Sequence, residues 1–244
     1  RYGYTVILLD TLEDEGNESE CINTLLTRSI DGIILVPCGE RPERLEKIDE
    51  QTPIVLIDRY FEDTSLSYIC TDNYRGALDG VKLLIENGHK EILCIRGVPH
   101  SMPSKERVKG YIDALRESGF DTRSRITGND YSITNGYLET KLAIGSPARP
   151  TAIFALSNTI MLGAIRAIGE SSLQIPDDVS ILSFDNNLFL DFLHPAVTRI
   201  SQPTKEISQL AVKILMERLS DKQSTPQQIK LPAQIIEGKS VKRF

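Results

Sequence analysis

Short apolar runs that alternate with amphipathic segments most constrain the fold of this chain. The runs are rich in β-branched residues and apolar on both faces, which is typical of strands in a parallel sheet covered by helices on both sides. They occupy Thr5–Leu9, Gly32–Val36, Ile54–Ile57, Ile92–Ile95, Ala152–Leu156 and Ser180–Phe184.

Between the runs, apolar residues recur with the spacing of an α-helix. These segments lie at 21–30, 77–85, 108–115, 160–168 and 207–219. Three of them stop at a glycine, namely Gly88, Gly119 and Gly169, and glycine after a helical pattern is a C-cap signal. The alternation of strand and helix predicts a doubly wound α/β fold.

Three proline-containing stretches without periodicity interrupt this alternation, at 97–103, 201–203 and 224–226. Such stretches are suited to join separate α/β lobes. The sequence therefore predicts two lobes between which the chain passes three times. We expect residues 1–98 and 203–222 to form an N-terminal lobe, and residues 99–202 and 223–244 to form a C-terminal lobe.

Charge and composition exclude several classes of function. The 28 basic and 34 acidic side chains give a net charge of −6, the wrong sign for a chain that itself binds nucleic acid. No apolar run approaches the ~18 residues of a membrane span, and no signal-peptide pattern is visible at the first residues. The four cysteines lack metal spacing and are expected to be reduced thiols.

Motifs of enzymes are absent from the sequence. It contains no GxGxxG and no GxSxG, and its three histidines lack the spacing of metal ligands. We therefore expect no catalytic residue, no cofactor and no metal.

Polar side chains follow most of the apolar runs. Ligands of open α/β sheets bind beyond the carboxyl ends of the strands, so these residues predict a polar cleft. Helix capping is the alternative role for each Asp, Asn and Ser among them. The positions are Asp10-Thr11, Pro37–Gly39, Asp58-Arg59, Arg96-Gly97, Ser157-Asn158 and 185–187.

Six segments, in this order and spacing, resemble the effector-binding domain of the LacI/GalR family of bacterial transcription regulators. Together they extend over most of the chain. They are Glu86–Ile92, Glu106–Tyr111, Arg149–Ala155, Leu162–Ala167, Ile175–Asp185 and Thr198–Pro203.

The resemblance implies the fold of periplasmic binding proteins, with two α/β lobes joined by three crossovers. It implies a cytoplasmic, homodimeric regulator, in most cases a repressor, that binds a small polar effector between the lobes. Sugars or their derivatives are the favoured class, and a nucleobase is the other candidate. The effector would change the hinge angle, and operator DNA would be contacted only through a helix-turn-helix head. Residues 1–4 resemble the end of the family's first helix, so that head, the hinge helix and the first strand are expected to precede this sequence.

The resemblance also implies the residues that bind the effector. Arg107, Asn158 and Asp185 match positions at which family members contact their ligands. Thr159 and Asn186 depart from the aspartates common at those positions, which puts the ligand's polarity in doubt but not the fold.

Four further candidates match the family less closely. Tyr131 falls where some sugar-responsive members place an aromatic ring, and Phe154 where some purine-responsive members stack a base. Packing in the core is the alternative for both. Gln202 and Ser101 are candidates at the lobe joints.

Two other functions fit the same fold. The first is an exported, monomeric sugar-binding protein, which a signal peptide upstream would identify, whereas a helix-turn-helix upstream would identify a regulator. The second is an α/β enzyme acting on sugars or nucleotides, which no motif supports.

Overall fold

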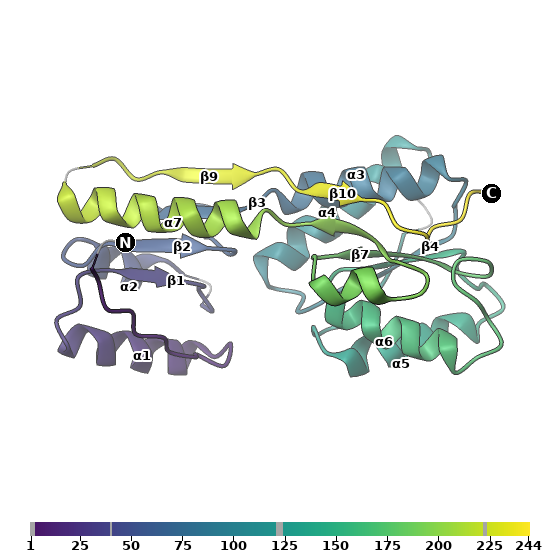
Figure 1. The fold of residues 1–244 in the computed structure, drawn as a ribbon, viewed down its shortest axis with the longest axis horizontal. Coiled ribbons are helices and arrows are strands. Elements are labelled where there is room, and N and C mark those ends of the chain that lie inside the picture. The colour runs from purple at the N-terminus through teal and green to yellow at the C-terminus, as the bar shows by residue number, and fades with distance from the viewer. Residues whose placement is uncertain (1–2, 40, 121–123, 222–223) are drawn as a thin grey trace. The chain divides into compact units, whose positions relative to one another are not determined.

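The computed structural model describes residues 3–39, 41–120, 124–221 and 224–244. The chain divides into two compact units. Unit 1 contains Arg1–Cys70 and Thr204–Lys230, and unit 2 contains Thr71–Pro203 and Leu231–Phe244. The chain therefore passes between the units three times, as the sequence predicts, and Figure 1 follows its course by colour.

Unit 1 is built on a four-stranded sheet in the order β1-β2-β3-β9. β2 lies between β1 and β3 and is parallel to both. The elements are α1 (Glu15–Thr27), β1 (Ile33–Leu35), α2 (Glu43–Asp49), β2 (Ile54–Ile57), β3 (Ser67–Thr71), α7 (Thr204–Ser220) and β9 (Gln228–Leu231), with the last residues of β3 and β9 belonging to unit 2.

Unit 2 is built on a six-stranded sheet in the order β10-β8-β7-β6-β4-β5, in which only the edge strand β10 is antiparallel to its neighbour among the pairs described. Its helices are α3 (Asn73–Glu86), α4 (Met102–Glu117), α5 (Ile133–Ile144), α6 (Asn158–Gly169) and the 3₁₀ helix η2 (Leu188–Phe192). Its strands are β4 (Ile92–Ile95), β5 (Arg125–Thr127), β6 (Ala152–Ala155), β7 (Ser180–Phe184), β8 (Thr198–Ser201) and β10 (Gln234–Ile236).

Helices cover both faces of the unit 2 sheet (Figure 1). Alternate residues of β6 point to opposite faces, so Phe154 packs in the core beneath α3 and α4, whereas Ile153 packs beneath α5 and α6. A strand that is buried on both faces is apolar at most of its positions. This explains why β4, β6 and β7 were predictable as continuous apolar runs.

The predicted strands at 32–36, 54–57, 92–95, 152–156 and 180–184 are confirmed to within a residue or two. The predicted strand at Thr5–Leu9 is wrong, because this segment has no regular secondary structure. Val6 is 86% exposed and Leu8 is 92% exposed, so the run pairs with no strand and packs in no core among the described residues. An apolar run becomes a strand only where a neighbouring strand accepts its hydrogen bonds.

The first boundary between the units differs from the predicted one. It lies after Cys70 rather than after residue 98, so α3 and β4 belong to unit 2. The reason is packing: α3 lies against α4, and a Cβ on Gly110 of α4 would lie 2.4 Å from the carbonyl oxygen of Tyr74 in α3. The other two crossings, after Pro203 and Lys230, lie one and eight residues beyond the expected ends at 202 and 222.

Among the described residues, no helix is long and apolar enough to cross a membrane. All four cysteines are free thiols, as expected.

Candidate functional site

Arg107 is a buried cation in the middle of unit 2. It lies on α4, and only 3% of its surface is exposed. Its guanidinium carbon stacks 3.7 Å from the ring centroid of Phe184, the last residue of β7. A buried charge must be hydrogen-bonded to be tolerated, so the groups around it are expected to be acceptors.

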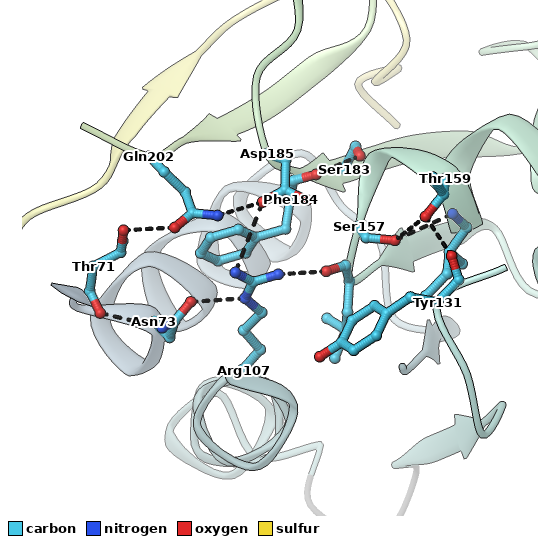
Figure 2. A network of polar contacts seen from close by, with 12 residues as sticks. Thr71, Asn73, Arg107, Tyr131, Ser157, Thr159, Ser183, Phe184, Asp185 and Gln202 are labelled. Carbon is cyan, nitrogen blue, oxygen red and sulfur yellow. Dashed lines mark hydrogen bonds and ion pairs between the residues drawn. The ribbon is translucent and has the colours of Figure 1, made fainter. Parts of the chain in front are cut away.

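Acceptors from three elements surround this guanidinium (Figure 2). Its Nε donates to Asn73 Oδ1 at 2.8 Å, and its Nη1 donates to the carbonyl oxygen of Leu156 at 2.6 Å. Its Nη2 lies 3.7 Å from Asp185 Oδ1, an ion pair without close contact. Since Nη2 carries two N–H groups, it keeps donor capacity for a further acceptor.

Asp185 ends β7 with an unusual backbone. Its φ of +80° lies in the left-handed region, which Asp tolerates better than most residues. The backbone N–H donates to the Ile200 carbonyl at 2.9 Å, and the side-chain Oδ1 accepts from Gln202 Nε2 at 2.5 Å. These contacts hold the carboxylate, which is about a quarter exposed, above the buried guanidinium.

Gln202 extends the network to the start of α3. Its Oε1 accepts from Thr71 Oγ1 at 2.6 Å, and the Asn73 amide donates to the Thr71 carbonyl at 3.2 Å. Figure 2 shows the resulting chain of contacts. We refer to the residues Thr71, Asn73, Arg107, Asp185 and Gln202 as the Arg107 network.

A second polar group lies beside this network (Figure 2). The Tyr131 hydroxyl lies 2.9 Å from Ser101 Oγ, and the Tyr131 carbonyl accepts from the Thr159 hydroxyl. Gly97 makes room for the ring, since a Cβ there would lie 2.1 Å from Tyr131 Cε1. Tyr131 is half-buried.

The structure thus brings five of the predicted residues into two adjoining groups, and places the other two differently. Phe154 is fully buried in the core, as the packing alternative describes. Asn158 is half-buried at the start of α6, where Ser157 rather than Asn158 caps the helix by accepting from Ile160 N at 3.2 Å.

Sequence reasoning missed Thr71 and Asn73. Both are buried polar residues at the turn from β3 into α3, whose N-cap is Asp72. The strand Ser67–Thr71 contains two polar residues and did not stand out as an apolar run. A cluster of short polar residues before a helical pattern was the available signal.

Unit 1 also carries polar residues at its strand ends. Thr11 Oγ1 lies 3.2 Å from Cys38 Sγ, and the buried Glu18 accepts from the Cys38 backbone N–H at 2.6 Å. Burial raises the pKa of the Glu18 carboxyl and of the Cys38 thiol. Arg59 pairs with Glu13 at 3.0 Å.

The Arg107 network suits recognition of a polar molecule. Its charged nitrogens donate, while the carboxylate and amide oxygens accept, which matches the mixed hydrogen bonding of hydroxyl groups. Among the described residues, no group of three His, Cys, Asp or Glu side chains could hold a metal ion.

Comparison with known proteins places the chain in a family. Residues 81–241 match the model of a periplasmic binding protein-like domain. The chain is 31% identical to the HTH-type transcriptional repressor PurR of Vibrio atlanticus, over 99% of this chain and 73% of that protein. It is 33% identical to the HTH-type transcriptional repressor CytR of Escherichia coli K12, over 89% of this chain and 64% of that protein. It thus matches about two thirds to three quarters of the length of these relatives.

Solved structures agree with this placement. A LacI family transcriptional regulator from Enterococcus faecalis, with bound ribose, is 25% identical and superposes with a TM-score of 0.86, covering 98% of this chain and 87% of that one. The chain therefore belongs to the LacI/GalR family of transcription regulators and forms its effector-binding domain.

Proposed function

We propose that this domain binds a sugar or sugar derivative at the Arg107 network, and that it does so as part of a cytoplasmic, homodimeric transcription repressor. The domain is a sensor rather than an enzyme. Operator DNA is contacted by a helix-turn-helix head, in keeping with the net charge of −6 on this chain.

The buried guanidinium of Arg107 carries the proposal. A protein stabilised by packing alone has no need for a charge in this position, since a buried ion pair often contributes little net stability. Here the guanidinium is held by Asn73 and the Leu156 carbonyl, with Nη2 left beside Asp185, whose carboxylate is about a quarter exposed. This arrangement presents a donor and an acceptor side by side, as vicinal hydroxyl groups require.

The surroundings favour a sugar over a nucleobase. A base is held mainly by stacking on an aromatic face, and Phe154, the residue expected to provide one, is buried in the core. Tyr131 remains half-buried next to Ser101, where it can lie against the apolar face of a sugar ring. The ribose bound by the similar Enterococcus faecalis regulator supports the same class.

A thermal-shift series tests this assignment. Ribose, hexoses, sugar phosphates and nucleobases are added to the wild-type chain and to Asp185→Asn, which keeps the shape of the side chain but removes its charge. A ligand at one hundred times its Kd stabilises by about 2.7 kcal/mol. We expect a sugar to raise the midpoint of the wild type by roughly 5–10 °C and to raise that of the variant much less. An equal rise in both would place the ligand elsewhere, and a rise with nucleobases alone would contradict the sugar class.

Exposed apolar residues support the homodimer. Leu188 and Phe192 of η2 are 85% and 80% exposed, and Phe189 beside them is partly exposed. Such clusters on a protein surface mark interaction sites. We propose that η2 contacts a second copy of the chain.

Sedimentation at several concentrations tests the dimer. We expect Phe192→Ser to raise the dimer dissociation constant by tenfold or more, because a buried aromatic ring dominates an interface of this kind. Exposed Leu142→Ser on α5 of the same unit is the matched control. A wild-type chain that stays monomeric at all concentrations would contradict this part of the proposal.

A further inference from the structure

A second buried arginine lies beneath η2. Arg199 of β8 is 4% exposed, and its guanidinium donates hydrogen bonds to three different residues. Its Nε donates to Asn186 Oδ1 at 2.6 Å, and its Nη1 donates to the Val197 carbonyl at 3.2 Å. Its Nη2 forms an ion pair with Asp191 Oδ1 of η2 at 2.5 Å. One rigid guanidinium therefore joins β8, the segment after β7 and η2.

These contacts adjoin the Arg107 network directly. Asn186 is the residue after Asp185, and residues of β8 form hydrogen bonds to both of them. Arg199 holds Asn186 through its side chain, Ile200 accepts from the Asp185 backbone, and Gln202 binds the Asp185 carboxylate. The turn between β7 and η2 is thus held at two consecutive residues. Asp185 lies beside Arg107, and Asn186 is bonded to Arg199.

We infer that Arg199 is a positioning residue that couples the state of the Asp185 carboxylate to the order of η2. This inference rests on the proposed function, which places Asp185 in the effector site. Asp185 is held in a left-handed backbone conformation that few residues adopt, so a shift of its carboxylate changes the course of the chain at Asn186.

Arg199 then transmits that change, because a buried guanidinium cannot give up an acceptor without leaving a charge poorly solvated. The planar fork fixes the angles between its three acceptors. A displaced Asn186 therefore moves the guanidinium and, with it, Asp191. Leu188 and Phe192 lie at the two ends of η2, so the exposed apolar surface changes with it.

This coupling has a thermodynamic consequence. If the effector alters η2, then any partner bound to η2 must alter effector affinity by the same factor. In the proposed dimer, Arg199 would be the residue through which effector binding and association influence each other.

Hydrogen exchange of the whole unliganded chain, read on the backbone amides of 186–192, tests the coupling. The variants are Asp185→Asn, Arg199→Met and the double variant. We expect each single variant to speed exchange of this segment by about tenfold, the effect of losing a hydrogen bond to a charged group. The double variant should be no faster than Arg199→Met alone.

Arg166→Met is the matched control, since Arg166 is an exposed arginine of unit 2 that pairs with Glu170. We expect it to leave exchange at 186–192 unchanged. Arg199→Lys keeps the charge but not the fork, so its exchange should lie between those of the wild type and Arg199→Met.

Additive effects of Asp185→Asn and Arg199→Met would overturn the coupling, and so would unchanged exchange in Arg199→Met. Should Arg199→Met fail to fold, Asp185→Asn combined with Asp191→Asn decides by the same criterion, because Asp191 is mostly exposed. The measurement uses no effector. Failure of the proposed function, an absence of sugar binding, is therefore separate from failure of the coupling.

Discussion

Each unit places an aspartate with a left-handed backbone directly after a strand. Asp58 follows β2 with φ +66°, and Asp185 follows β7 with φ +80°. Both donate their backbone N–H to the neighbouring strand, to Ile69 at 3.1 Å and to Ile200 at 2.9 Å. The two turns are thus built alike, although the surrounding side chains differ.

The two units differ in how Arg107 and Arg218, one buried arginine of each, are paired. In unit 2, Arg107 lies under its aspartate, and its carboxylate partner is neither close nor buried. In unit 1, the buried arginine is Arg218 of α7, which binds both oxygens of Asp49 at 2.5 and 2.8 Å. The charge of Arg218 is thus matched within the fold, whereas Nη2 of Arg107 keeps donor capacity for a further acceptor.

The largest expected effect is the loss of Arg218. Arg218→Met removes the cation that binds the mostly buried Asp49 and that donates to the Ile54 carbonyl, so we expect the free energy of unfolding to fall by about 3–5 kcal/mol. Denaturant unfolding measures this loss. Sugar affinity of the folded fraction should stay within about twofold, and a tenfold loss would show that the pair of Arg218 and Asp49 also serves the site.

Loss of Arg107 should have a smaller effect on stability and a larger one on binding. Arg107→Met removes the donor to Asn73 and to the Leu156 carbonyl, which we expect to reduce the free energy of unfolding by about 2–4 kcal/mol. Calorimetric titration should show no sugar binding. If Arg107→Met still bound the sugar, Arg107 would be no more necessary for the ligand than Arg218 is.

The paired substitutions Asp58→Asn and Asp185→Asn compare the two turns directly. Asparagine tolerates the left-handed backbone, so the difference reports the carboxylate. We expect Asp185→Asn to reduce stability by about 1 kcal/mol, since Arg107 loses its counter-charge. Asp58→Asn makes the same change in unit 1, and its loss of stability is the reference for that of Asp185→Asn. Equal losses in urea unfolding would make the two turns equivalent.

The smallest expected effects are changes of stability with pH, and these have opposite signs in the two units. Burial lowers the pKa of His89 in unit 2, so the unfolded chain binds the proton more readily and stability falls as the pH drops below about 6.5. Burial raises the pKa of Glu18 in unit 1, so stability falls as the pH rises through that raised value. Neither slope exceeds ~1.4 kcal/mol per pH unit.

Unfolding followed between pH 4.5 and 7.5 checks these signs. Relative to the wild type, His89→Gln should lose the decline in stability on acidification, and Glu18→Gln should lose the decline as the pH rises above the ordinary pKa of a glutamate. Gln keeps an acceptor for the Cys38 N–H, so the second comparison isolates the charge. Parallel curves for wild type and either variant would contradict the corresponding assignment.

The strands that were predictable from the sequence are those made mostly of apolar residues. β3 and β8 were missed because they carry buried polar residues, such as Thr71 and Arg199, whose partners are distant in the chain. Thr5–Leu9 shows the reverse error, since it has the composition of a strand but pairs with no strand in the part of the chain that the structure describes. The burial of apolar residues can be predicted from local composition. The burial of polar residues cannot, because it depends on hydrogen bonds that form only in the folded chain.

The same limit applies to the site. Arg107, Asp185 and Gln202 were identified through family resemblance, and the structure brings them together. Thr71 and Asn73 were missed because the strand that leads into α3 did not stand out as an apolar run. The predicted site therefore lacked the residues that bind Gln202 and the Arg107 Nε.

The three crossings also govern the order in which the molecule can be made. Residues 231–244 complete unit 2, where Ser240 bonds to Ile181 and Thr198, and Phe244 packs edge-on against His89 and bonds to Asn87. During synthesis, unit 2 therefore cannot be completed until residues 231–244 have been made, although its first residue, Thr71, is made early. In a nascent chain, the segment around Arg107 cannot complete its packing before then. Loss of a few residues from 231–244 would therefore disrupt the core of unit 2 rather than a peripheral segment.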